Sequence, residues 1–133
     1  DLVRSTLRLR PDRIIIGEVR GAEALDMLKA WNTGHPGGIA TLHANSALSG
    51  LSRLEQLIGE ASAQVPHDLI AETIDCVVYI TRRAGAHRVE TVAHMNGLGR
   101  GGYDLIPVQP DLQLVLPSLP FSEPLLSTAP ERT

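Results

Sequence analysis

The chain has 133 residues, 43% of them hydrophobic and 20% charged, which suits one globular domain with a single core. The net charge of −3 gives no basic footprint for nucleic acid or an anionic membrane surface, and no apolar run approaches the roughly 20 residues of a membrane span. Cys76 is the only cysteine, which excludes an internal disulfide, and we expect its side chain in the core.

Helix and strand are predicted to alternate in the first half of the chain. Residues 1–9 favour a short helix that ends before Pro11. The isoleucine-rich stretch 13–19 is typical of a strand buried on both faces, and the apolar residues of 21–31 have helical spacing. After a loop rich in Gly and Pro, residues 39–43 predict a second strand. This order implies parallel strands joined by a right-handed crossover.

The strongest helical signal follows the second strand. Asn45 or Ser46 can cap this helix at its N-terminus. Its large apolar residues fall on one stripe, formed by Leu48, Leu51, Leu54, Leu57 and Ile58. After a break at 64–66, residues 67–74 predict a further helix.

Strands are predicted again in the last part of the chain. Residues 76–81 form an apolar, β-branched run that indicates a buried strand. Residues 88–95 alternate as in a half-exposed antiparallel strand, with a glycine-rich turn at 97–102 and a short strand at 103–108. Residues 109–133 carry scattered prolines without a sustained period, and we expect a tail that is mostly disordered or loosely docked.

Two ionisable side chains stand where the two predicted parallel strands end. These are Glu18 and His43. Parallel strands deliver their carboxyl ends to one edge of a sheet, where ligands bind in open α/β folds. A carboxylate there can polarise a water molecule, and an imidazole can contact a phosphate oxygen or move a proton. Either residue alone is more often structural, so the candidate site is the pair.

Several short motifs carry a resemblance to a known family. The sequence RIIIGEVR at 13–20 resembles the Walker B segment of the secretion and conjugation traffic ATPases, which have Gly-Glu where most P-loop enzymes have Asp-Glu. The sequences TGH at 33–35 and ATLHANS at 40–46 resemble the histidine box of that family. LRPD before the strand and WNTGH after the helix are most similar to TrbB-like conjugal-transfer ATPases of type IV secretion, and the resemblance covers residues 1–108.

The resemblance implies a role for each candidate residue. Glu18 would be the general base that orients the water attacking the γ-phosphate, and His43 would sense that phosphate. Three further residues are candidates for nucleotide binding. Arg20 could bind phosphate or face a neighbouring subunit, with a surface salt bridge as an equal alternative. Thr41 could hydrogen-bond near the phosphates, and His35 could support the site or serve only the structure of its loop.

The fold and setting also follow from the resemblance. It implies an α/β RecA-like P-loop NTPase core fragment in residues 1–108, with a mostly parallel sheet and a C-terminal antiparallel extension. For an intact family member it implies ATP with Mg²⁺ and a hexamer that acts with other secretion or conjugation components. The expected location is cytoplasmic, peripheral to the inner membrane of a bacterium, without direct nucleic-acid binding or a transmembrane segment.

The phosphate-binding loop of P-loop enzymes, Gly-x-x-x-x-Gly-Lys-Ser/Thr, does not occur in these residues. The only lysine, Lys29, lies in a predicted helix and cannot replace it. The chain also opens at Asp1 rather than Met, so we expect the C-terminal part of a motor domain. On this hypothesis the strand of the missing loop pairs beside the His43 strand, and the chain alone has no cofactor and neither binds nor hydrolyses ATP.

Two alternatives remain open from the sequence. The absent loop and the leucine-rich tail also suit a truncated, non-catalytic module that docks on intact ATPase subunits. A small metalloenzyme using Glu18, His35 and His43 is the weaker alternative, because the spacing lacks the His-x-x-x-His of a helical zinc site. We therefore expect no metal site formed by the chain itself.

Overall fold

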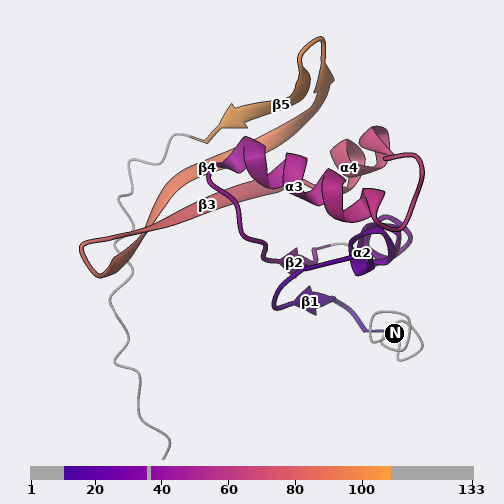
Figure 1. The fold of residues 1–133 in the computed structure, drawn as a ribbon, viewed down its shortest axis with the longest axis horizontal. Helices are drawn as coiled ribbons and strands as arrows, with labels where there is room; N and C mark the ends of the chain where they lie inside the picture. The colour runs from indigo at the N-terminus through magenta and orange to yellow at the C-terminus, as the bar shows by residue number, and fades with distance from the viewer. Residues whose placement is uncertain (1–10, 36, 109–133) are drawn as a thin grey trace, which may run out of the picture.

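The computed structural model describes residues 11–35 and 37–108, so the predictions for residues 1–9 and 109–133 lie outside the described part (Figure 1). The described elements are β1 (Ile15–Ile16), α2 (Glu23–Asn32), β2 (Ile39–Ala40), α3 (Ala47–Gly59), α4 (His67–Thr73), β3 (Cys76–Arg83), β4 (Ala86–Gly99) and β5 (Gly102–Pro107). They form an α/β structure with one parallel and one antiparallel sheet. None of its described helices has the length and apolar character of a membrane span.

The parallel pair β1 and β2 is joined through α2, as the sequence predicts. Ile15 stands opposite Ile39 in the register. Beyond the regular ladder, the Val19 N–H donates to the Thr41 carbonyl at 2.9 Å, so the two segments stay side by side past the strand ends. The regular strands are shorter than predicted, because the chain bends at Gly17 directly after β1.

The crossover helix α2 is fastened to β1 by its last aromatic residue. The indole N–H of Trp31 donates to the Ile14 carbonyl at 3.3 Å. Gly38, just before β2, lies so close to this indole that a Cβ at Gly38 would sit 2.0 Å from its nitrogen. Glycine is therefore the residue that allows the helix end and both strands to pack this tightly.

The second sheet is antiparallel, in the order β3-β4-β5. The antiparallel strand predicted at 88–95 and the short strand predicted at 103–108 are confirmed, although β4 continues into the predicted glycine turn. The expectation of a mostly parallel sheet is wrong for the described residues, since β3 pairs with β4 rather than with β1 or β2. A hairpin partner next in sequence forms its ladder at a lower loop-closure cost than a distant parallel strand.

Strand β3 is not buried, which corrects a further prediction, and β1 is not buried on both faces, since Ile15 is 69% exposed. The residues of β3 alternate between partly buried and exposed along most of its length. Val77 packs against the core, whereas Cys76 and Val78 are exposed. The placement of Cys76 in the core is therefore wrong, because the helices cover only one face of this sheet.

The main core lies between α2, α3, α4 and the covered face of the antiparallel sheet. Its buried members are Val19, Ala24, Met27, Leu28, Leu51, Leu54, Leu57, Ile58, Ile70 and Met95. The predicted leucine stripe of α3 is confirmed except at Leu48, which is 53% exposed in the first turn of the helix. Ser46, one of the two predicted caps, is the N-cap of α3.

Leu57 and Leu48 of α3 give a matched test of the core, because the first is buried and the second is exposed. Leu57→Ala should lower the free energy of unfolding by about 2–5 kcal/mol, because Leu57 is fully buried and its truncation leaves a cavity. Leu48→Ala, on the same helix but exposed, should change it by less than about 0.5 kcal/mol. Urea unfolding followed by circular dichroism measures both. Equal losses for the two variants would contradict this arrangement of the core.

Candidate active site

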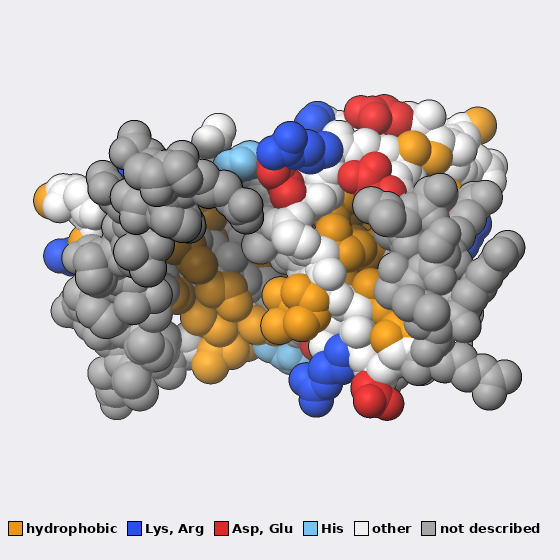
Figure 2. Space-filling model, turned by 90° about the horizontal axis from the view of Figure 1, so that it is seen from below, with side chains coloured by type: hydrophobic (Ala, Val, Ile, Leu, Met, Phe, Trp, Pro, Cys, Tyr) orange, Lys and Arg blue, Asp and Glu red, His pale blue; other side chains and the backbone are white. Residues whose placement is uncertain are grey.

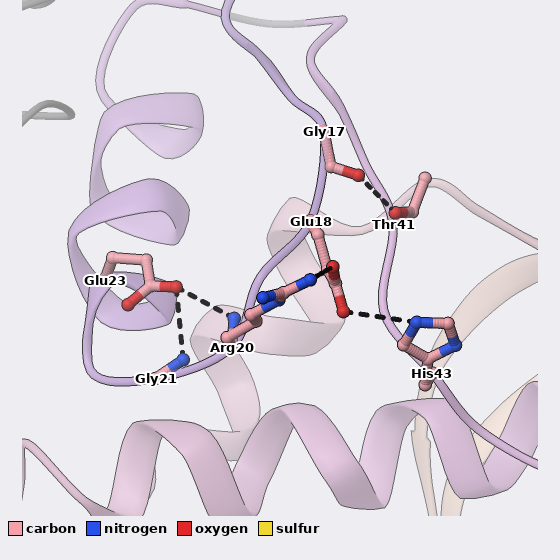
Figure 3. A network of polar contacts seen from close by, with 7 residues as sticks. All are labelled: Gly17, Glu18, Arg20, Gly21, Glu23, Thr41 and His43. Atoms are coloured by element: carbon pink, nitrogen blue, oxygen red, sulfur yellow. Dashed lines mark hydrogen bonds and ion pairs between the residues drawn. The ribbon is translucent and has the colours of Figure 1, made fainter.

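The two strand-end side chains predicted from the sequence meet in the structure. Glu18 lies two residues beyond β1, and His43 lies three residues beyond β2. The Oε1 atom of Glu18 is 3.2 Å from Nε2 of His43 (Figure 3). Val19, next to Glu18, is buried in the core and anchors this part of the chain. The shared edge expected from parallel pairing is thus observed as a direct contact.

Arg20 completes this group from the other side of the carboxylate. Its Nη2 donates to Oε2 of Glu18, so the two oxygens of Glu18 face two different basic side chains (Figure 3). The hydrogen bond from Arg20 lowers the pKa of Glu18 below its ordinary value of 4.5, and the nearby charges of Arg20 and His43 act in the same direction. Together these outweigh the partial desolvation of the carboxylate, which keeps Glu18 ionised at neutral pH.

Glu23 holds the loop that carries Arg20. At the start of α2, its Oε1 accepts hydrogen bonds from the N–H groups of Arg20 at 2.8 Å and Gly21 at 3.1 Å (Figure 3). The hydrogen bond from the Arg20 amide is the main cause of the lowered pKa of Glu23. The sequence interpretation missed this residue. A carboxylate in the first turn of a predicted helix, where acidic residues are favoured, was the available signal.

His43 is positioned by the start of α3. Ser46 Oγ accepts from the Ser49 N–H at 3.1 Å, and Ser49 Oγ accepts from the Ser46 N–H at 2.8 Å, which is a reciprocal capping box. The Asn45 N–H also donates to Ser49 Oγ. The turn that follows His43 is therefore fixed, whereas the imidazole itself is 93% exposed and free of the core.

The remaining two candidates do not reach the carboxylate. The Thr41 hydroxyl donates to the Gly17 carbonyl and so joins the two strand-end segments (Figure 3). His35 lies in the loop before β2, partly buried, and its Nδ1 has no hydrogen-bond partner among the described residues. Neither side chain makes a hydrogen bond or ion pair with Glu18 or His43 in the described part of the chain.

The group has the chemistry of an open, charged surface rather than that of a metal centre or an enclosed pocket. No three His, Cys, Asp or Glu side chains of the described residues are arranged to hold a metal ion. A hollow of about 550 Å³ lies elsewhere, lined by Leu25, Lys29 and the segment before α4. An ionised carboxylate flanked by an exposed guanidinium and an exposed imidazole can orient a water molecule beside a bound oxyanion.

Comparison with known proteins shows which family the sequence matches. A family model described as "Type II/IV secretion system protein" matches residues 1–100. The conjugal transfer protein TrbB of Rhizobium radiobacter is 55% identical over 102 residues, which are 77% of this chain and 32% of that protein. The type IV secretion system protein PtlH of Bordetella pertussis is 39% identical over 107 residues, 74% of this chain and 32% of that protein.

A solved structure agrees with these sequence matches. The crystal structure of the VirB11 ATPase from the Brucella suis type IV secretion system, in complex with sulphate, superimposes with a TM-score of 0.65 at 29% identity. It covers 70% of this chain and 30% of that one. The resemblance predicted from the motifs is confirmed, and the chain spans about a third of the length of the curated relatives.

The Arg20–Glu18 contact leads to a prediction about ionisation. Arg20→Gln should raise the pKa of Glu18 towards its ordinary value of 4.5, because the largest cause of the lowered pKa is removed. Since the folded-state pKa lies below the unfolded one, the contact stabilises the fold above the unfolded-state pKa. This stabilisation is lost as the pH falls through the folded-state pKa. Carboxyl NMR titration measures the effect, with Arg53→Gln on α3 as the control; an unchanged Glu18 pKa in Arg20→Gln would contradict the assignment.

Proposed function

Because the chain belongs to the family of type II/IV secretion system proteins, we propose that it is the C-terminal part of the motor domain of a TrbB-like ATPase. The intact ATPase would hydrolyse ATP to power conjugal DNA transfer or type IV secretion. The observation that carries this proposal is the contact between Glu18 and His43 at the shared edge of two parallel strands. The similarity to a protein whose structure is titled a VirB11 ATPase supports it.

In this proposal Glu18 orients the water that attacks the γ-phosphate of ATP. The contact from Arg20 keeps the carboxylate ionised, so it can accept a hydrogen bond from that water. Arg20 is also an exposed guanidinium, and guanidinium groups pair well with phosphate oxygens. The two alternatives for Arg20, a salt bridge and a phosphate contact, are thus compatible if the side chain exchanges Glu18 for a bound phosphate.

His43 is suited to report the presence of the γ-phosphate. Its imidazole is highly exposed and touches Glu18 by a single contact, while the turn behind it is fixed by the cap of α3. If the His43 imidazole turned from Glu18 to a phosphate oxygen, the turn between His43 and α3 would have to adjust. We assign Thr41 to holding the strand ends together and His35 to the structure of the loop before β2, where its Nδ1 is buried without a hydrogen-bond partner among the described residues.

A larger motor domain would also complete the parallel sheet. We propose that residues 1–108 belong to a RecA-like P-loop core and that residues 109–133 are an appended tail. Ile15 and Ile39, opposite each other in the register, are 69% and 59% exposed. Figure 2 shows hydrophobic side chains at the surface on the side of the molecule where β1 and β2 lie in Figure 1. Such a face is suited to contact with further parts of a domain.

The nucleotide would be ATP with Mg²⁺ in the intact protein. Arg20 and His43 suit the oxyanions of a phosphate, but the described residues offer no cluster of carboxylates for the metal. Mg²⁺ would neutralise charge on the phosphates, and its ligands would come from elsewhere in the protein. The proposed setting is a hexamer on the cytoplasmic side of the bacterial inner membrane, in contact with other secretion or conjugation components.

A second candidate is a truncated interaction module that docks on intact ATPase subunits. The exposed apolar side chains of the described sheets, among them Ile15 at 69% and Val78 at 51%, favour it. The two candidates differ in whether the Glu18 group becomes catalytic once a phosphate-binding loop is supplied. They can therefore be separated by one set of fusion proteins.

The experiment joins this chain to the preceding part of TrbB of Rhizobium radiobacter, which is similar enough over the matched segment to form a common domain. The fusion should hydrolyse ATP, and Glu18→Gln should lower kcat by about 100-fold or more, as expected for loss of a general base. Glu72→Gln, at an exposed carboxylate on α4, is the matched control and should keep full activity.

Full activity of the Glu18→Gln fusion would contradict the motor proposal, and an inactive but folded parent fusion would favour the interaction module. The chain of 133 residues alone should show no binding in an ATP titration at micromolar concentrations, because it lacks the loop that cradles the phosphates. Micromolar affinity of the isolated chain would show that this dependence on the loop is wrong.

A further inference from the structure

One face of the antiparallel sheet carries a patch of apolar side chains and has no helix over it among the described residues; the exposed Asn96 and Asp104 lie further along β4 and β5. We call this face the outer face. A row of three valines crosses it from strand to strand, Val78, Val92 and Val108, since Val78 pairs with Val92 and the Val108 N–H donates to the Val92 carbonyl at 2.8 Å. The next row holds Cys76, His94 and Ile106. Among the described residues, all but Val92 are exposed, with Val78 at 51% and Ile106 at 48%.

The opposite face of the same strands shows what is unusual about the outer one. Val77, Met95 and Leu105 lie on that opposite face and pack into the core below α3 and α4. An antiparallel sheet covered on one side normally carries polar residues on the other, and continuous apolar patches on a surface mark an interaction site. In Figure 1 the β3–β4 hairpin also projects well beyond the helices. The outer face is therefore a candidate interaction surface.

We propose that the occupant of the outer face is the chain's own segment 110–126. The chain leaves β5 at Val108, which is itself part of the outer face, so the segment is attached at the edge of this face. It is rich in large apolar residues, namely Leu112, Leu114, Val115, Leu116, Leu119, Phe121, Leu125 and Leu126. Only Asp111 and Glu123 carry charge within it.

The prolines of the segment favour this occupant and this way of binding. The sequence of the segment has four prolines, Pro110, Pro117, Pro120 and Pro124, and this spacing disfavours a long helix in which the leucines would form one stripe. What remains is packing of its side chains across the face. Three strands span only about 10 Å, which a few extended residues can cross.

Tethering distinguishes this occupant from a second copy of the chain. A segment attached at the rim of its binding face is present at an effective concentration of the order of millimolar, whatever the protein concentration. A second copy must bind from solution and would leave the outer face on dilution. Concentration dependence therefore separates the two occupants.

Cys76 provides the probe, because it is the only cysteine in the chain and lies on the outer face. The rate of its reaction with a small thiol reagent should be low in the full chain. The double variant Leu114→Ser with Leu116→Ser should react several-fold faster, at every protein concentration. Gln113→Ala with Ser118→Ala, in the same segment, is the matched control and should leave the rate unchanged.

Equal rates in the full chain and the leucine double variant would overturn the proposal. A low rate that rises on dilution of the unaltered chain would overturn it in favour of a second copy. If the double variant does not fold, as judged by circular dichroism, Phe121→Ala tests the same contact with one substitution and should also raise the rate. The test involves no nucleotide, so its outcome is independent of the proposed ATPase activity.

Discussion

The parallel pairing of β1 with β2 is the constraint on which the candidate site depends. Glu18 and His43 are 25 positions apart in the sequence and come together only because the crossover through α2 returns the chain beside β1. The Thr41–Gly17 contact and the Val19–Thr41 hydrogen bond maintain that pairing beyond the short ladder. Arg20 and His43 then hold the Glu18 carboxylate ionised and oriented, because it lies between a guanidinium and an imidazole.

The elements of the first half could be predicted because their determinants are local. The isoleucine run marks β1, Ser46 caps α3, and helical periodicity marks the buried leucines of α3. The meeting of Glu18 with His43 followed from the parallel direction of the two strands, which a connection through a helix implies. Glu23 was missed because its function, accepting two backbone N–H groups of the Arg20 loop, is visible only once that loop is folded.

Errors in the second half have a common physical origin. A β-branched run such as that at β3 indicates a strand, but not its partner or how many of its faces are covered. The hairpin connection makes β4 the partner of β3, and because the helices cover only the other face of the sheet, Cys76 and Val78 are exposed.

The error at Leu48 has a different cause. Leu48 has the right spacing for the core, yet it lies in the first turn of α3, beyond the packed part of the helix.

A crystal structure of the fusion with TrbB bound to a non-hydrolysable ATP analogue tests the proposed site most directly. The Glu18 carboxylate and the His43 imidazole should face the terminal phosphate from the same edge of one parallel sheet. A terminal phosphate bound far from that edge, or Glu18 and His43 separated onto opposite edges, would contradict it.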